Sequence, residues 1–141
     1  MIKNLNKEEA QKLLKELKLG HLGCVLESGE PYVVPVNYLF SGDEIYIHCL
    51  PGQKLDALRA NGKICLQVEK ISEPCRWQSA IAFGEFQEVK RMNKKIEILK
   101  AFAARFDHLT PVEAMSEEHW NSGGLVVFRF GIKRLTGMSE S

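Results

Sequence analysis

Residues 45–69 read IYIHCLPGQKLDALRANGKICLQVE and decide the fold, because a strand pattern gives way to a helix and then to a second strand. β-Branched and aromatic residues predict a strand up to Leu50, after which Pro51 and Gly52 turn the chain. A helix of about two turns follows and ends just before Gly62. The free backbone N–H groups at the start of this helix are therefore expected to point back toward the end of the first strand.

An amphipathic helix is predicted upstream, within LNKEEAQKLLKELKLG at residues 5–20. Asn6 and Glu9 have the spacing of a capping box, and Gly20 has the position of a C-terminal glycine. The apolar stripe repeats at i, i+3, i+4 and i+7 and consists of Ala10, Leu13, Leu14 and Leu17. Such a stripe requires a sheet to cover.

Six apolar, β-rich runs predict the strands of that sheet. GHLGCVLE, PYVVPVNYLF and EIYIHCL are separated by SGE and SGD, which is typical of two consecutive hairpins. KICLQVE, SAIAFGEFQEV and LVVFRFGIKRL complete the set. Pro35 lacks the N–H of a ladder and predicts an edge strand or a bulge, while Gly84 predicts a bend or bulge.

The pattern turns helical again at Met92, where apolar residues share one stripe as far as Phe106. Thr110 and Pro111 predict the start of another short helix, and the final MSES is expected to be a loose tail. The sequence therefore predicts an α+β fold, a six-stranded antiparallel split β-barrel with flanking helices, in a single domain spanning residues 1–141.

The charge and composition of the chain restrict the kinds of partner that we expect. The formal net charge is +1, so no global field favours nucleic acid or an anionic membrane surface. We find neither an apolar signal core nor an apolar run of the roughly 18 to 20 residues that a membrane span needs, and we expect a cytoplasmic protein. The four cysteines show no metal-ligand spacing, so we expect reduced thiols and no metal.

Lys54 lies in the first turn of the short helix, which is the unfavourable end for a cation unless an anion is nearby. A lysine beside free N–H groups is a general device for binding phosphate. The stretch is not a P-loop, because it has neither that motif's glycine spacing nor a Ser or Thr after the lysine. From the residues alone, a solvated lysine on a helix that covers the end of a barrel remains the alternative.

Three segments together resemble the FMN-binding split-barrel superfamily related to pyridoxamine 5'-phosphate oxidase. They are PVNY at residues 35–38, the stretch 45–69, and WQSAIAFGEFQEV at residues 77–89. Within that superfamily the chain looks most like the nitroimidazole-resistance-type flavoproteins. The likeness extends from GHLGCV to KRLTG and implies an FMN cofactor.

The resemblance implies where the phosphate of FMN is held. The residue matching Lys54 binds the phosphate, with Gln53 beside it. Ser79 matches a position that supplies a hydroxyl to the phosphate, and Trp77 and Gln78 flank that position. A lysine and a hydroxyl suit this role chemically, because charge-assisted hydrogen bonds to a phosphate are strong.

The resemblance also implies where the flavin ring lies. The segment matching Pro35, Val36, Asn37 and Tyr38 runs along the isoalloxazine ring, largely through backbone groups, with Val36 packing on its face. The residue matching His48 lies beside the flavin, where a histidine can act as a proton donor, a substrate anchor or a structural hydrogen-bonding group. We take His48 as the candidate catalytic residue.

Relatives of this type are homodimers with the cofactor at the interface, so Trp120 is expected to reach the partner's flavin. The implied activity is a two-electron reduction of a small, nitroaromatic-type acceptor by an electron donor. The chain ends in KRLTGMSES, where true pyridoxamine-phosphate oxidases carry an arginine-rich segment, so their activity is not implied. Three alternatives stay open: a deazaflavin-dependent reductase, a haem protein with His21 or His48 as axial ligand, and a non-catalytic flavin-binding module.

Overall fold

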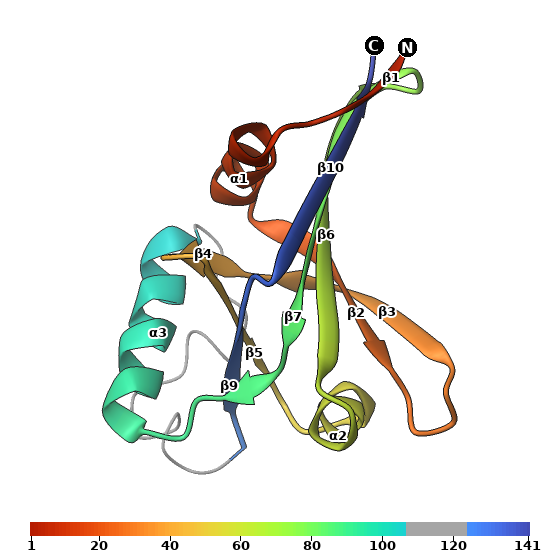
Figure 1. Ribbon diagram of the computed structural model, residues 1–141. Coiled ribbons are helices and arrows are strands. Elements are labelled where there is room, and N and C mark those ends of the chain that lie inside the picture. Colours follow the sequence, from red (N-terminus) through yellow and green to blue (C-terminus); the bar gives the residue numbers. More distant parts are fainter. Residues whose placement is uncertain (107–123) are drawn as a thin grey trace.

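The computed structural model describes residues 1–106 and 124–141 (Figure 1). Trp120 and the helix predicted from Thr110 and Pro111 lie outside the described residues. Three helices are described: α1 Lys7–Glu16, α2 Gln53–Ala60 and α3 Met92–Arg105. None of the helices in this part of the chain has the length and apolar character needed to cross a membrane.

The strands form two antiparallel sheets. The six-stranded sheet has the order β1-β10-β7-β6-β2-β3. Its strands are β1 Ile2–Asn4, β2 Leu19–Val25, β3 Pro31–Asn37, β6 Lys63–Glu73, β7 Arg76–Glu85 and β10 Arg134–Glu140. The four-stranded sheet has the order β4-β5-β9-β8, with β4 Leu39–Ser41, β5 Glu44–Cys49, β8 Gln87–Glu88 and β9 Val126–Gly131. The predicted α+β class is confirmed, but neither sheet is closed into a barrel of six strands.

The structure has two strands where the sequence predicts a single one at residues 31–40, and Tyr38 lies between them. It separates β3 from β4 and carries the chain from the larger sheet to the smaller one. Its side chain is fully buried, and its hydroxyl donates a 2.7 Å hydrogen bond to the carbonyl of Leu14 in α1. Burial raises the pKa of the Tyr38 hydroxyl well above its ordinary value, so it stays protonated as the donor.

Gly84 is not a bulge. β6 and β7 pair without interruption across it, and Ile64 is its direct partner. A Cβ atom at this position would lie 2.4 Å from the carbonyl oxygen of Gly131 and 2.6 Å from the Phe130 ring. Glycine is therefore required because β7 passes close to the chain where β9 ends.

Two further boundaries differ from the prediction. The capping box of Asn6 and Glu9 is present as predicted, but α1 ends at Glu16, and Gly20 lies inside β2. The predicted loose tail is instead part of β10, which reaches Glu140 and pairs with both β1 and β7. Pairing on both sides supplies backbone hydrogen bonds that a local propensity for loop cannot reveal.

The main core lies between the two sheets. Apolar side chains of α1 and α2 cover opposite ends of this core, and α3 packs on the outer side of the four-stranded sheet (Figure 1). Alternate residues of the six-stranded sheet thus point into the core, as in the buried set Leu22, Leu66, Val68, Ala80 and Ala82. None of the described residues covers the opposite face of the six-stranded sheet, which we call the open face.

Apolar side chains are exposed on the open face. Direct pairing places residues of neighbouring strands on the same side of the sheet. By this register the open face includes Leu19, Val33, Ile71 and Met138, which are 55%, 67%, 61% and 44% exposed. Exposed apolar residues that share one face of a sheet are typical of interaction surfaces.

Candidate functional site

The junction of β5 and α2 has the architecture of an anion site. The strand ends at Cys49, and the helix begins at Gln53 after Pro51 and Gly52. Gly52 is the N-cap, and glycine has no side chain that could accept a hydrogen bond from the first turn of α2. The first N–H groups of the helix are consequently left for another acceptor.

Lys54 brings a positive charge to this helix start. Its side chain is half-buried, and its charge acts on the thiols of Cys24 and Cys49. Burial raises the pKa of both thiols, and the nearby ammonium of Lys54 partly offsets that rise. Within the described part of the chain, the Lys54 ammonium has no hydrogen bond or ion pair, so it is available to an anion.

The other side of the helix start has the opposite charge. A hollow of about 610 Å³ lies between the β2–β3 turn and α2, and Gln53 lines it. Its wall also carries the carboxylates of Glu27, Glu30 and Asp56. Three carboxylates repel a phosphate, so an anion at this helix start is favoured on the side of Lys54 and disfavoured beside Gln53.

β3 confirms the predicted edge position of Pro35, because it is the last strand of its sheet. Tyr38 N–H donates to Lys18 O at 3.1 Å, and ladder pairing alternates along an antiparallel strand. The backbone groups of Pro35 and Asn37 therefore point to the free edge. Val36 is buried in the main core, so its side chain is not exposed at this edge for packing on a ring.

His48 lies on the side of β5 that faces α3. Its ring meets the Phe102 ring edge-on, with centroids 4.6 Å apart and an interplanar angle of 84°. Cys49, which Lys54 influences, points into the main core on the opposite side of the strand. His48 and Lys54 thus flank the same strand end from two sides.

Ser79 lies on the open face and is hydrogen-bonded there. The side-chain amide of Gln67 donates to Ser79 Oγ at 3.1 Å and to Glu69 Oε2 at 3.3 Å. Because that nitrogen is the donor, Gln67 Oε1 accepts from Nδ1 of His21 at 3.0 Å. Ser79 Oγ is an acceptor in this chain of hydrogen bonds, which leaves its own hydrogen for another partner.

The described residues do not bring all the predicted site residues together. Lys54 lies with core thiols beside α2, whereas Ser79 lies on the open face. Trp77 donates a 2.7 Å hydrogen bond to Glu140 at the far end of β10, and Gln78 faces a hollow against α1. The contact of His21 with Gln67 could not be predicted from the sequence, because only the pairing of β2 with β6 brings the two residues together.

The structure is an α+β protein with two antiparallel sheets, and its described helices include one that starts at an uncapped strand-to-helix junction beside a lysine. The chain belongs to the pyridoxamine 5'-phosphate oxidase family, whose sequence model matches residues 6–138. An uncharacterized protein of Rhizobium meliloti is 33% identical over 88 residues. That alignment covers 62% of this chain and 58% of the relative, so it spans little more than half of the relative's length.

Solved structures share the fold over the whole chain. An FAD-binding protein of Mesorhizobium loti has a TM-score of 0.77 at 25% identity, with 100% of this chain and 99% of that one covered. A proposed 5-nitroimidazole antibiotic resistance protein of Bacteroides thetaiotaomicron has a TM-score of 0.80 at 20% identity, covering 99% and 89%. The flavocytochrome Anf3 of Azotobacter vinelandii has a TM-score of 0.74 at 22% identity, covering 99% and 69%.

Proposed function

We propose that this protein binds FMN and uses it to reduce a small acceptor. The observation that carries the proposal is the uncapped start of α2 with the Lys54 ammonium, which has no partner among the described residues, in a chain of the pyridoxamine 5'-phosphate oxidase family. A helix N-terminus and a lysine complement the dianionic phosphate of FMN. The flavin-related names of similar structures support the same cofactor class.

Different residues would bind different parts of the cofactor. Lys54 and the first N–H groups of α2 hold the phosphate, and backbone groups of Pro35 and Asn37 bond the polar edge of the ring. His48 supplies a proton from its ring to the reduced acceptor. Bound FMN would supply two-electron transfer from a reduced donor, such as a nicotinamide, to the acceptor.

The first test is the visible spectrum of the freshly purified protein, followed by identification of any small molecule released by heat. A yellow protein that releases FMN is the expected result. A Soret band would replace the proposal with the haem alternative, and a released deazaflavin would replace FMN. A colourless protein that takes up no added FMN would refute the proposal.

Catalysis is tested separately from binding. The FMN-loaded protein is mixed anaerobically with NADH or NADPH, and bleaching of the flavin is followed before a nitroaromatic acceptor is added. Bleaching and subsequent reoxidation are expected for the proposed reductase. Bound FMN that no donor reduces would instead indicate the non-catalytic flavin-binding module.

We propose that the open face forms a homodimer. Ser79 lies on the open face, whereas Lys54 of the same chain does not. In a dimer, Ser79 of one copy would supply its hydroxyl to the phosphate that Lys54 of the other copy binds. The exposed apolar residues of this face supply the burial that a stable dimer needs. The complete site would then combine residues of two chains.

Val33→Glu should weaken this dimer by at least about tenfold, because a buried unpaired carboxylate in an apolar interface is costly. Val33 is exposed in the single chain, so the substitution should leave folding intact. Sedimentation equilibrium measures the dimer dissociation constant. Met92→Glu is the matched control, since Met92 is 42% exposed but lies at the start of α3, on the outer side of the four-stranded sheet. Equal effects of the two substitutions would contradict the proposed interface.

Ser79→Ala should weaken FMN binding by about three- to tenfold, the scale of one hydrogen bond of roughly 0.5 to 1.5 kcal/mol. Fluorescence titration of the apoprotein with FMN measures the effect. Thr136→Ala is the control, because Thr136 lies on the same face, one strand away. An unchanged FMN affinity in Ser79→Ala would remove Ser79 from the site.

A further inference from the structure

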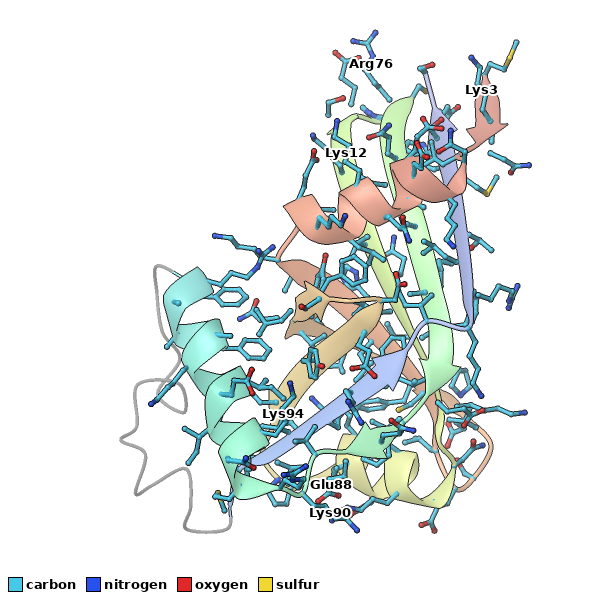
Figure 2. All side chains as sticks on the ribbon, turned by 60° about the vertical axis from the view of Figure 1, so that its left-hand side comes forward. Lys3, Lys12, Arg76, Glu88, Lys90 and Lys94 are labelled. Carbon is cyan, nitrogen blue, oxygen red and sulfur yellow. The ribbon has the colours of Figure 1, made fainter. Side chains whose placement is uncertain are left out.

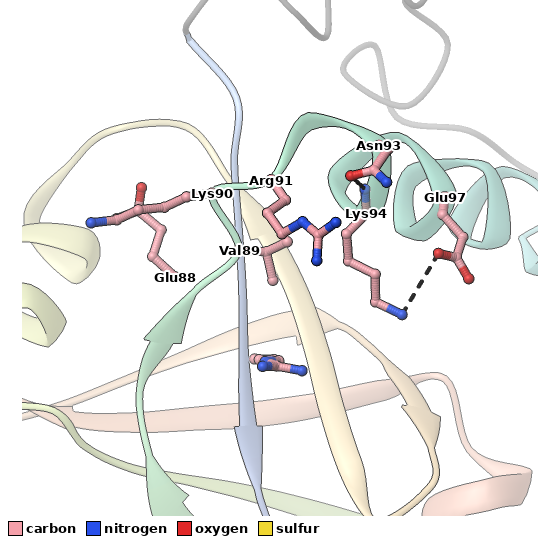
Figure 3. Close-up of a pocket in the computed structure, with 8 residues that line it drawn as sticks. Glu88, Val89, Lys90, Arg91, Asn93, Lys94 and Glu97 are labelled. Atoms are coloured by element: carbon pink, nitrogen blue, oxygen red, sulfur yellow. Dashed lines mark hydrogen bonds and ion pairs between the residues drawn. The ribbon is translucent and has the colours of Figure 1, made fainter.

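A second, basic pocket lies at the opposite side of the four-stranded sheet from the main core. This basic pocket has a volume of about 450 Å³ and is formed by β8, β9 and the start of α3 (Figure 3). Its charged lining residues are Lys90, Arg91, Lys94, Arg129, Glu88 and Glu97. Arg129 is far from Lys90, Arg91 and Lys94 in the sequence, and only the fold brings these cations to one cavity.

The lining of the basic pocket contains more cationic than anionic side chains. Glu88 is already held by Arg59 of α2, whose Nε and Nη2 lie 3.0 and 2.9 Å from Glu88 Oε1. Glu97 is 3.6 Å from the Lys94 ammonium. Arg91 has no ion pair among the described residues. Both carboxylates of the lining are thus engaged, while an unneutralised guanidinium remains.

Arg91 and Lys94 extend to the same side of the chain, whereas Lys90 points away from them (Figure 3). Arg129 enters the pocket from β9, and its Nη1 donates to Glu44 Oε2 at 3.1 Å. The hydroxyl of Tyr46 donates to the same oxygen at 2.8 Å. Glu44 therefore fixes the guanidinium of Arg129 and leaves other N–H groups of its fork for a ligand.

The start of α3 adds a second reason for an anion. The helix has 14 residues, its N-cap Arg91 makes no side-chain cap, and its first turn contains no acidic residue. Cations at this end of a helix oppose the helix dipole. A bound anion would remove both the dipole conflict and the repulsion between the neighbouring cations.

The size and lining of the basic pocket suit a small molecule. Its volume lies in the range typical of small-ligand pockets, and Val89 adds an apolar side chain to the lining. Guanidinium groups bind phosphate in a bidentate manner. We propose that the basic pocket binds a small phosphorylated molecule through Arg91, Lys94 and Arg129, at a site distinct from Lys54.

The test uses the FMN-saturated protein, so that the Lys54 site is filled, and titrates it with AMP and with adenosine by calorimetry. AMP is expected to bind and adenosine to bind at least tenfold more weakly. Arg91→Gln should weaken AMP binding about tenfold, because one charge-assisted hydrogen bond is removed. Lys12→Gln is the control, since Lys12 lies on α1 at the other end of the molecule from Lys90 and Lys94 (Figure 2).

Three results would overturn the proposal. AMP and adenosine binding equally would exclude recognition of the phosphate. Arg91→Gln behaving like Lys12→Gln would exclude the basic pocket. AMP binding that survives Arg91→Gln but disappears in Lys54→Ala, measured without FMN, would assign the anion to the α2 junction. Thermal unfolding of each variant checks that Arg91→Gln leaves the fold intact.

Discussion

Lys54→Ala should weaken FMN binding by about ten- to a hundredfold, because a charge-assisted hydrogen bond contributes roughly 1.5 to 3 kcal/mol. Lys54 is half-buried at the uncapped start of α2, and its ammonium has no partner among the described residues. Its removal therefore takes a cation from the phosphate without releasing an internal carboxylate. Fluorescence titration of the apoprotein measures the change.

Riboflavin provides the control for this prediction, because it has the same ring and lacks the phosphate. The affinity for riboflavin should be the same in the wild type and in Lys54→Ala. Lys133→Ala serves as the matched variant, since the Lys133 side chain is 68% exposed and its ammonium lies 3.9 Å from Glu85 Oε1. A loss of equal size for FMN and riboflavin would show that Lys54 acts on the fold and not on the phosphate.

Gly84→Ala should lower the free energy of unfolding by about 1 to 3 kcal/mol, the usual cost of overpacking. The new methyl would lie 2.4 Å from a backbone oxygen of Gly131, which cannot rotate away as a flexible side chain can. β7 and the end of β9 must therefore separate, and the packing of Phe130 must change with them. Urea denaturation followed by circular dichroism measures the loss.

Gly131→Ala is the matched control on the other side of the same contact. A Cβ atom there would meet nothing within 4 Å, so this substitution should change the unfolding free energy far less. Equal destabilisation by the two variants would mean that loss of glycine flexibility, and not the close approach of β7 to β9, sets the cost.

The anion site at α2 has a charge asymmetry with consequences for binding. Lys54 favours a phosphate, while Glu27, Glu30 and Asp56 line the hollow beside Gln53. A phosphate bound at this helix start is therefore expected on the side of Lys54. Of the two predicted phosphate residues in this turn, the electrostatics favour Lys54 and disfavour Gln53.

Local sequence was sufficient to predict the elements that depend on residues close together in the chain. The capping box of Asn6 and Glu9 forms as predicted, because both partners lie within one turn. The SGD hairpin forms with positive φ angles at Gly42 and Asp43, as a two-residue turn requires. The junction of strand, turn and helix at Lys54 could likewise be predicted from the sequence, because the proline, the glycine and the helical pattern follow one another directly.

The tertiary structure decided whatever depends on distant residues. The predicted strand at residues 31–40 divides at Tyr38 because its hydroxyl reaches Leu14 in α1, and the C-terminal segment becomes β10 because β1 and β7 supply hydrogen bonds on both sides. The network of His21 with Gln67 and the basic pocket at Arg129 likewise arise from strand register. The sequence alone determined turns, caps and the charge at the α2 junction, because these involve neighbours in the chain. Pairing across the sheets decided which side chains share a site, because burial and hydrogen bonding act between residues far apart in the chain.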